Sequence, residues 1–531
     1  MYGKRPTVTS LHGVVAAAHP LAAQAGAKLL ASGGNAFDAA AATAAALNVV
    51  EPYMSGLAGL GLATCYVAKE QRVRTLDFVP RVPAKLPVER FRRREDLQRG
   101  PLSVAAPGNF AGWAELVRAY GRKPLGETLQ PAIALARDGF ALAEFGVAEI
   151  NEQLPLLKPL TFCDEWAKTY ATKPVALRDI IRQPDLARTL EGLAAEGPDL
   201  LYAGALGRTI VGHLEQLGGC LTLADLAAVK PVWKEPMTAR YRGLVVNTLP
   251  PPCEGFQFLL TLRILERFDL ARLEHNGTEH LDTVWRAIRL AAGERIAHNN
   301  PTPEKLATIM ADANVERLAA RVRDGKPVEG PAEQWTAPTG HAMAMEHHTT
   351  SFSIADREGN AICVTQSLGS PFGSGVVVPG TGLCLNNFLY WIDPNPASPN
   401  HTAPGSALPM CMAPTVSLRD GRPVLALGTP GSYGILQTQA QAMVQYLDFA
   451  LPLQEAIEQP RARLWDGRLV EPETRIAPAV LQALRARGHD IAPGEAWTMR
   501  VGGMQAVAID PATGLMTGAC DPRRDSYVAT A

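Results

Sequence analysis

The character of the chain changes at residues 325–340, where GKPVEGPAEQWTAPTG is rich in glycine and proline and shows no hydrophobic period. Before this stretch, apolar residues recur mainly at helical spacing. After it, short β-branched runs alternate with glycine and proline. We therefore expect a helix-rich part, an exposed connecting loop, and a strand-rich part that opens at Thr349.

The helical patterns of the first part, several of which end at glycine or proline, predict helices at 19–32, 35–51, 112–121, 125–139, 186–197, 255–268, 280–298 and 304–325. Residues 61–79 predict a strand, a turn and a second strand. In the second part, TTSFSIADREGNAICVTQSL (349–368) has two β-branched runs around DREGN, which indicates a hairpin. Further strands are expected within 374–387, 413–431 and 504–521, and helices at 437–449 and 478–488.

The composition limits the partners that this protein can have. The chain has 531 residues, 47% of them hydrophobic, and a net charge of −1, so nothing favours a nucleic acid or an anionic membrane as partner. Residues 1–20 lack the apolar run of a secretory signal. The eight cysteines show no metal-ligand spacing, and neither does the group His341, Glu346, His347 and His348. We expect a cytoplasmic protein with no metal and no cofactor.

The threonine pair at 349–350 allows two interpretations. Threonine favours the start of a β-strand, so the pair has a purely structural explanation. Cleavage of the His348–Thr349 bond would instead give Thr349 a free α-amine with a reference pKa of about 7.7–8.0. One residue would then supply both a hydroxyl nucleophile and the base that activates it.

Several stretches, in a fixed order, support the second interpretation. They are HPLAAQAGAKLLASGGNAFDAA, VVEPYMSGLAG, VAAPGNFAGWAEL, TTSFSIADREGNA, FGSGVVVPGTGLCLNN, APTVSLRDGRPVLALGTPG and GGMQAVAIDPATGLMTGACDPRRD. Through them nearly the whole chain resembles the γ-glutamyltransferase family of N-terminal nucleophile hydrolases. The resemblance implies self-cleavage between His348 and Thr349. It also implies a four-layer αββα fold shared by a large subunit (1–348, with 325–348 as the loop before the cut) and a small subunit (349–531), together one catalytic domain.

The resemblance also implies roles for individual residues. Ser367 falls where the family has a second threonine whose hydroxyl bonds the nucleophile, and a serine hydroxyl can do the same. Gly431 and Ser432 fall at the family's Gly-Gly pair, whose N–H groups form the oxyanion hole.

The positions that hold a γ-glutamyl group in the family differ here. The family arginine aligns with Val79, and Arg81 lies two residues on, which on a strand is the same face. The remaining polar binders are replaced by Gly369, Phe388, Trp391, Met410 and Cys411. A zwitterionic glutamyl head would lose its hydration in such a pocket without gaining partners, which favours an uncharged or aromatic acyl group.

We therefore predict a self-processing threonine amidohydrolase that acts on something other than a standard γ-glutamyl compound. Three alternatives stay open at this point. They are a true γ-glutamyltransferase or glutathione hydrolase with a rebuilt site, an acylase for β-lactam side chains, and a non-catalytic scaffold that is never cut.

Overall fold

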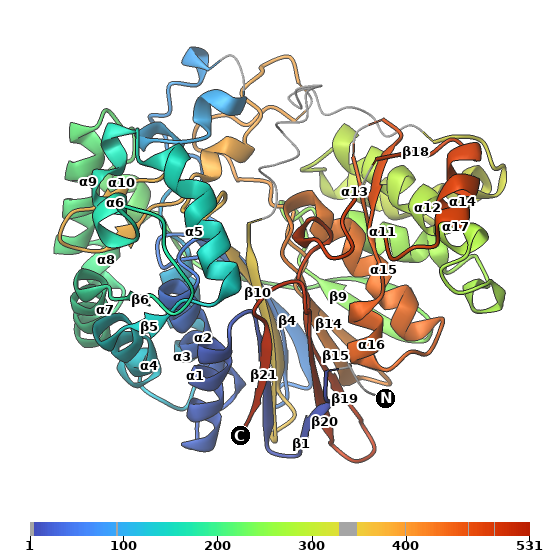
Figure 1. Ribbon diagram of the computed structural model, residues 1–531, viewed down its shortest axis with the longest axis horizontal. Helices are drawn as coiled ribbons and strands as arrows, with labels where there is room; N and C mark the ends of the chain where they lie inside the picture. Colours follow the sequence, from blue (N-terminus) through green and yellow to red (C-terminus); the bar gives the residue numbers. More distant parts are fainter. Residues whose placement is uncertain (1–4, 92–93, 329–347, 399, 466, 493) are drawn as a thin grey trace.

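Two antiparallel sheets face each other between two layers of helices, as Figure 1 shows. The computed structural model describes residues 5–91, 94–328, 348–398, 400–465, 467–492 and 494–531. The expected αββα order is confirmed. Most of the predicted loop before Thr349, including His341, Glu346 and His347, lies outside the described residues.

The first sheet has the strand order β21-β2-β10-β11-β3-β4-β7. Its strands are β21 (Tyr527–Thr530), β2 (Gly13–Ala17), β10 (Thr350–Asp356), β11 (Ala361–Ser367), β3 (Leu60–Val67), β4 (Arg72–Asp77) and β7 (Val232–Lys234). The predicted hairpin is confirmed as β10 and β11, with Thr350 opposite Gln366. It lies inside the sheet, between β2 and β3, and β10 pairs with β2 from Phe352 to Asp356.

The second sheet has the strand order β1-β20-β19-β15-β14-β9-β8. Its strands are β1 (Val8–Ser10), β20 (Met516–Cys520), β19 (Gln505–Ile509), β15 (Arg422–Gly428), β14 (Thr415–Arg419), β9 (Leu244–Thr248) and β8 (Met237–Tyr241). Both sheets thus contain strands from before and after Thr349. Each sheet is therefore completed by strands from both parts of the chain.

The outer face of the first sheet is covered by the helices of the N-terminal half (Figure 1, blue to green). They are α1 (Pro20–Ala31), α2 (Ala36–Val50), α3 (Asn109–Tyr120), α4 (Leu125–Asp138), α5 (Glu144–Leu157), α6 (Asp164–Thr169), α7 (Pro184–Glu196), α8 (Asp199–Tyr202), α9 (Ala205–Gln216) and α10 (Leu223–Ala227). The alanine-rich α2 is buried along its whole length, and small side chains let α1 and α4 pack closely on it. Asn35 caps it, in a reciprocal capping box with Asp38.

The second sheet is covered by α11 (Phe256–Leu265), α12 (Thr278–Ala297), α13 (Pro303–Met310), α14 (Asp312–Arg323), α15 (Ile435–Leu447), α16 (Leu453–Glu458) and α17 (Pro478–Ala486). The single helix predicted at 304–325 is wrong, because the chain is extended at Ala311, where ψ is 146°. Arg263 of α11 hydrogen-bonds the Met310 carbonyl and forms an ion pair with Asp312 (2.7 Å). It thus satisfies polar groups where one helix ends and the next begins.

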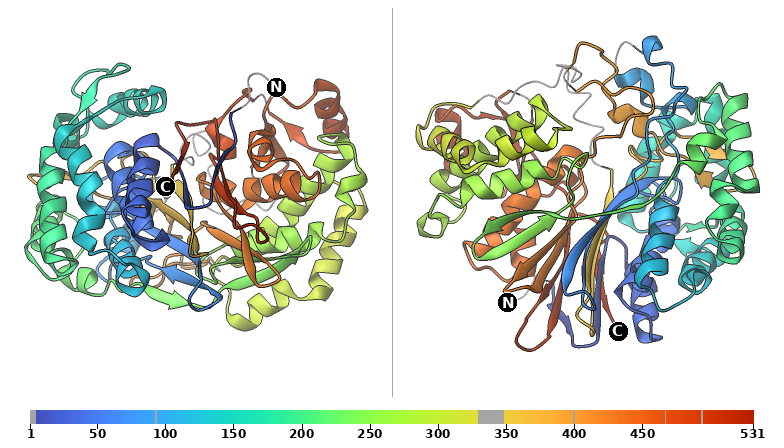
Figure 2. Two further views of the ribbon diagram at one scale, coloured as in Figure 1. Left: turned by 90° about the horizontal axis from the view of Figure 1, so that it is seen from below. Right: turned by 180° about the vertical axis from the view of Figure 1, so that it is seen from behind.

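The two sheets pack on each other through small apolar clusters such as Val14, Ala355, Val507 and Met516. The two views of Figure 2 show the sheets stacked, with the helical layers outside them. Short strand pairs complete the fold: β5 (Phe140–Ala141) with β6 (Ile180–Ile181), β12 (Val377–Val378) with β13 (Leu383–Cys384), and β17 (Leu469–Pro472) with β16 (Ala462–Leu464) and β18 (Asp490–Ile491).

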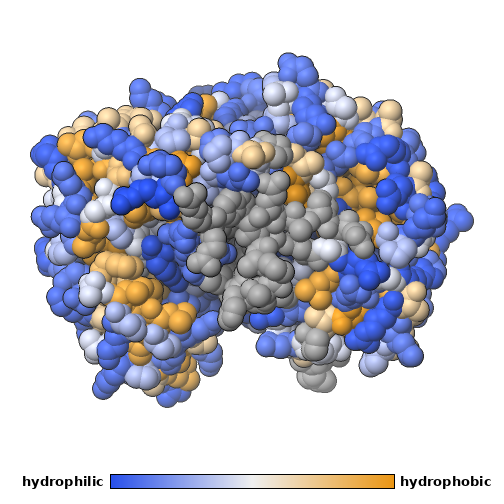
Figure 3. Space-filling view, turned by 90° about the horizontal axis from the view of Figure 1, so that it is seen from above, coloured by the Kyte–Doolittle hydropathy of each residue, from blue (hydrophilic) through white to orange (hydrophobic). Residues whose placement is uncertain are grey.

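The surface mixes polar and apolar side chains, as the coloured parts of Figure 3 show for the upper face. In the part of the chain that the structure describes, no helix is both long and apolar enough to cross a bilayer. All eight cysteines are free thiols, and seven of them are buried. Burial raises the pKa of several of these thiols, for example that of Cys363 to about 11, which keeps them protonated at neutral pH.

Candidate active site

The His348–Thr349 peptide bond immediately precedes β10 of the first sheet, which begins at Thr350. The two residues are 8% and 4% exposed, so the threonine hydroxyl is shielded from solvent. Because Thr350 pairs with Gln366, the next step of the ladder brings Thr349 opposite Ser367. The hairpin register thus places the two hydroxyls together.

Three oxygens crowd at this point. Thr349 Oγ1 lies 2.6 Å from the carbonyl oxygen of His348 and 3.3 Å from Ser367 Oγ. The Ser367 hydroxyl lies 2.9 Å from the same carbonyl oxygen and accepts the Gly369 N–H at 2.9 Å. Since Ser367 accepts from Gly369, its own proton is free to go to the carbonyl. The hydroxyls of Thr349 and Ser367 thus both donate towards the carbonyl oxygen of His348 in the uncut chain.

A buried ion pair holds the main chain on the C-terminal side of this bond. Arg524 Nη2 lies 2.7 and 2.8 Å from the two carboxylate oxygens of Glu51, which follows α2. Arg524 Nη1 donates to the Thr349 carbonyl at 3.2 Å, and the Thr350 hydroxyl donates to Glu51 at 3.1 Å. Both side chains of the pair are completely buried. The guanidinium fork thus ties the first half of the chain to the second at Thr349.

Other titratable groups around Arg524 respond to the same charges. Burial and the charge of Glu51 raise the pKa of Asp525 to about 6, against the opposing effect of Arg524. Burial, with help from Arg524, lowers the pKa of His19 to about 4. The surroundings of Thr349 are therefore a low-dielectric region that contains several acids and one central cation.

The turn after β15 presents backbone N–H groups at the same end of the sandwich. A Cβ added at Gly428, the last residue of β15, would lie 2.0 Å from Ser351 Oγ in β10. The chain then passes through Gly431 (φ 126°) and Ser432 (φ 52°) into the 3-10 helix η8 (Ser432–Gly434) and α15. The positive φ of Ser432 is a conformation that favours glycine, which agrees with the glycine expected there from the resemblance.

Arg463 fixes the orientation of this turn. Its Nη1 donates to the Gly431 carbonyl at 2.8 Å, and the side chain, in β16, is 1% exposed. Because a trans peptide places its C=O and N–H on opposite sides, the Ser432 N–H is directed away from Arg463. The turn also opens α15, whose N-terminal end carries a partial positive charge. Such a turn can stabilise a developing oxyanion.

The predicted substrate-side residues, here called the wall, lie beside the loop after Ser367 and beside the Gly431–Ser432 turn. Phe388 and Trp391 belong to the 3-10 helix η7 (Phe388–Trp391), with their rings 5.6 Å apart. A Cβ at Gly369 (φ 102°) would come within 3.2 Å of the Trp391 ring, so Gly369 lets the ring approach the loop after Ser367. On the other side, Cys411 Sγ lies 4.0 Å from Ser432 Oγ, and Met410, next to it, is buried.

Arg81 does not lie on a strand, contrary to the argument that it shares the face of Val79. The strand β4 ends at Asp77, whose side chain accepts the Val79 N–H (3.0 Å) in a turn. Arg81 is exposed and donates to the Gly405 carbonyl at 3.0 Å. Within the described residues, the structure records no contact between Arg81 and Thr349 or Ser367. Its role in substrate binding stays a prediction without such support.

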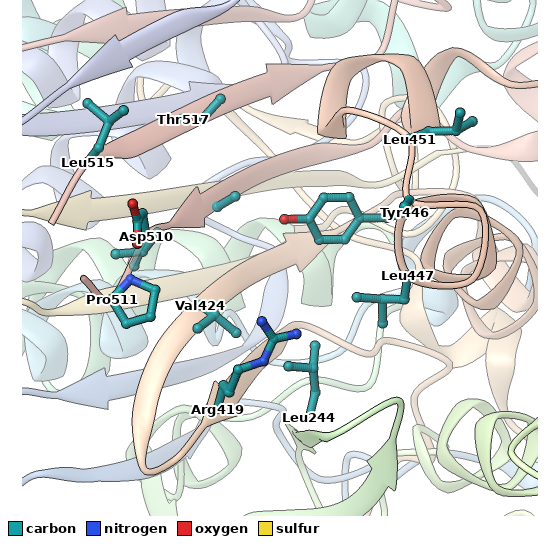
Figure 4. Close-up of a pocket in the computed structure, with 13 residues that line it drawn as sticks. Leu244, Arg419, Val424, Tyr446, Leu447, Leu451, Asp510, Pro511, Leu515 and Thr517 are labelled. Atoms are coloured by element: carbon teal, nitrogen blue, oxygen red, sulfur yellow. The ribbon is translucent and has the colours of Figure 1, made fainter. Parts of the chain in front are cut away.

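A separate cavity of about 520 Å³ lies at the opposite end of the second sheet (Figure 4). Arg419, Tyr446 and Asp510 line it together with apolar side chains such as Leu244. Since β15 runs from this end towards Gly428, the cavity is a full strand length from the turn at Gly431. Among the described residues, no cluster of three or more His, Cys, Asp or Glu side chains forms a metal site.

A threonine at the start of an inner strand, in an αββα sandwich, beside a second hydroxyl and an N–H-bearing turn, defines the class of N-terminal nucleophile hydrolases. The family model described as gamma-glutamyltranspeptidase matches residues 22–531. The chain therefore belongs to the gamma-glutamyltranspeptidase family, and it is a hydrolase of amide bonds.

Relatives within the family carry two kinds of name. The acylase ACY 1 proenzyme of Pseudomonas sp. (strain SE83) is 35% identical over 98% of this chain and 94% of its own length. The glutathione hydrolase proenzyme of Bacillus subtilis (strain 168) is 29% identical over 97% and 90%. Among solved structures, the cephalosporin acylase from Bacillus halodurans is 28% identical and superposes with a TM-score of 0.90, covering 100% of this chain and 98% of its own.

Sequence reasoning missed Glu51, Arg524 and Arg463. Two of them carry a signal in the sequence, a charge beside apolar or small residues: Glu51 follows ALNVV, and Arg463 lies between Ala462 and Leu464. Arg524 lies in the charged stretch DPRRD, where no such signal marks it. A buried charge requires a partner, so such positions predict ion pairs without saying which charges meet.

Proposed function

We propose that Thr349 becomes the N-terminal nucleophile of this amidohydrolase after the chain cuts itself at the His348–Thr349 bond. The observation that carries the proposal is the close group of Thr349 Oγ1, Ser367 Oγ and the His348 carbonyl oxygen. The products would be a large subunit of residues 1–348 and a small subunit of 349–531. They stay together because both sheets take strands from each.

Self-cleavage begins with attack of Thr349 Oγ1 on the carbonyl carbon of His348. Ser367 donates a hydrogen bond to the carbonyl oxygen as negative charge develops there (2.9 Å in the intact chain). The C–N bond breaks, the hydroxyl proton ends on the departing Thr349 nitrogen, and an ester links His348 to Thr349 Oγ1. Water then hydrolyses the ester, which leaves a carboxylate on His348 and a free amine on Thr349.

The mature enzyme repeats this chemistry on an external amide. The Thr349 amine takes the hydroxyl proton, Oγ1 attacks the substrate carbonyl, and the N–H groups of the Gly431–Ser432 turn receive the oxyanion. The leaving amine takes the proton, and water releases the acid from the acyl-enzyme. Since Thr349 is only 4% exposed in the intact chain, the uncut precursor is expected to be inactive towards external substrates.

We infer that the acyl group is uncharged or aromatic. Phe388, Trp391, Met410 and Cys411 stand where a γ-glutamyl site needs polar groups, and a zwitterion placed against them would be desolvated without partners. The relatives named acylases, one of them a cephalosporin acylase, support this reading. The second candidate is a glutathione hydrolase, which the Bacillus subtilis relative favours.

The decisive experiment compares the parent with Thr349→Ala and Thr349→Ser on a denaturing gel. The parent should give two fragments in place of one 56.8 kDa band, and the smaller should begin with the sequence TTSFS. The alanine variant should stay intact and inactive, whereas the serine variant keeps a hydroxyl and should still be cut. An alanine variant that splits at this bond would overturn the proposal, and a parent that remains whole and inert would favour the scaffold.

A substrate panel then separates the two candidates. Amides of aromatic acids and of β-lactam side chains should be hydrolysed faster than a γ-glutamyl anilide. A preference for the γ-glutamyl anilide would mean that other residues rebuild the glutamyl site.

A further inference from the structure

Glu149 is a buried acid that none of the steps above uses. It lies on α5, which packs over the Thr349 end of the first sheet through contacts of Phe145 and Gly146 with Tyr53. Its side chain is directed at the residue before the cleavage point, since Glu149 Oε2 lies 3.2 Å from His348 Nε2. Both residues are 8% exposed, so the contact is shielded from solvent.

We propose that Glu149 is a positioning residue for self-cleavage, which acts by holding the His348 side chain so that the carbonyl of His348 stays against Thr349 Oγ1. The proposal rests on the function proposed above. It adds a recognition element for the acyl side of the bond, a carboxylate that takes an N–H donor from the residue to be cut away.

The contacts along the chain show why such an anchor matters. The amine side of the bond is fixed by β10 and by Arg524, which donates to the Thr349 carbonyl. The carbonyl oxygen is fixed by Ser367. On the acyl side, the side chain of His348 contacts Glu149.

Intramolecular attack depends steeply on the placement of the reacting atoms. Holding both sides of a bond in place can raise the rate of intramolecular cleavage by several orders of magnitude. A small displacement of the carbonyl loses part of this increase. A charge-assisted bond in a buried place is strong enough to hold one rotamer of His348. Without it, the His348 side chain and its carbonyl gain freedom, and attack slows while the fold is kept.

The test follows cleavage of full-length chains made by cell-free synthesis, with samples taken over time and separated on a denaturing gel. Glu149→Ala should slow the first-order cleavage by about tenfold. Glu149→Gln should keep most of the parent rate, because its amide oxygen still accepts the Nε2–H of a neutral imidazole. Glu152→Ala changes an exposed acid on the same helix and should cleave at the parent rate.

A double-mutant cycle with His348→Ala separates positioning from a general effect on the fold. If Glu149 acts through His348, the double variant should cleave no more slowly than either single variant. If the rate reductions of the two single variants multiply in the double variant, the proposal is overturned. A Glu149→Gln variant that cleaves as slowly as Glu149→Ala would also overturn it. If Glu149→Ala fails to fold, the comparison of Glu149→Gln with His348→Ala still decides, because the proposal requires the first to be fast and the second slow.

The outcomes also distinguish this inference from the function on which it rests. Parent-like cleavage of Glu149→Ala together with an intact Thr349→Ala chain would reject the role of Glu149 alone. Cleavage of Thr349→Ala would reject both.

Discussion

Two regions meet at Thr349, and they differ in how they use polar side chains. The junction of the two halves of the chain is a buried polar network, in which Ser367, Glu51 and Arg524 all contact Thr349 or its neighbour. The wall on the other side, with Phe388 and Trp391, is apolar and aromatic. In the proposed function, the polar network performs or positions bond cleavage, and the wall receives the acyl group.

The difference teaches which part of such a site is free to change. A hydroxyl nucleophile needs its donors and acceptors at fixed distances, so the junction tolerates little variation. The wall only has to match the shape and polarity of an acyl group, and its polar residues can be exchanged for apolar ones together. The predictions below test this division, first at the junction and then at the wall.

The largest effect is expected from Arg524→Ala. This change leaves the Glu51 carboxylate buried without its cation, which should lower the free energy of unfolding by about 3–5 kcal/mol. It also removes the donor to the Thr349 carbonyl, so self-cleavage should slow. Urea unfolding and a gel time course measure the two effects.

The matched control for Arg524 is Arg72→Ala, which breaks a half-exposed ion pair with Glu70. Its unfolding free energy should change by less than about 0.5 kcal/mol. If the two variants lose similar free energies of unfolding, the buried ion pair does not hold the junction. The contrast between a rigid junction and a variable wall would then be wrong.

The next effect concerns the Gly431–Ser432 turn. Arg463→Ala frees the Gly431 carbonyl, and the peptide that carries the Ser432 N–H should lose its fixed orientation. We expect kcat to fall by about 10–100-fold with little change in KM, a smaller loss than deletion of an oxyanion donor itself. Steady-state kinetics on an aromatic amide measures it.

Two companions sharpen the test of Arg463. Arg463→Lys can still donate to the carbonyl and should recover part of kcat. Arg468→Ala removes a partly exposed arginine that pairs with Asp490 and should leave kcat unchanged. A rise in KM at constant kcat would mean that Arg463 supports substrate binding. The Gly431–Ser432 turn would then belong with the wall residues in function.

The wall is tested by Trp391→Ala. Loss of the indole removes apolar surface beside Phe388, so kcat/KM for an aromatic amide should fall by about tenfold, mostly through KM. Turnover of a γ-glutamyl anilide should not fall with it. Trp497→Ala, at an exposed tryptophan, is the control. Equal losses for both substrates would mean that Trp391 serves the fold and does not select the acyl group.

Much of this site could be predicted from the sequence, because hairpin register is a local property. The β-branched runs of 349–368 and the DREGN turn set β10 against β11, and that register brings Ser367 to Thr349. The turn at Gly431 and the aromatic residues of the wall could be named from motifs in the same way. Their roles in catalysis and binding stay predictions that the variants above test.

The partners of buried charges could not be predicted, because they depend on how distant segments pack. Glu51 and Arg524 are separated by almost the whole chain, and Glu149 lies on a helix that no pattern indicated. The position of Arg81 failed for a different reason. A single Asp77 side chain turns the backbone and ends the strand before the arginine.

The smallest effect is expected from Asp525→Asn. This change tests whether the several acids at the junction lower the free energy of unfolding. The pKa of Asp525 rises from about 3.8 to about 6 on folding, so between these values the folded protein binds more protons than the unfolded chain. The free energy of unfolding therefore falls as pH rises from about 4 to about 6 and stays low above it. Asparagine cannot ionise, so above pH 6 the variant should be more stable than the parent by about 1 kcal/mol, a figure reduced because the carboxyl is only half-buried.

Urea unfolding at pH 4 and pH 7.5 checks this sign, since the gain should be present at the higher pH and absent at the lower. Asp510→Asn is the control, because hydrogen bonds within its own turn lower the pKa of that exposed carboxyl and its loss should bring no gain. An equal gain at both pH values would trace the effect to hydrogen bonding at position 525. A gain confined to the higher pH would show that the junction tolerates an unfavourable ionised acid beside Glu51, because the fold gains more from the other contacts of this polar network than it loses there.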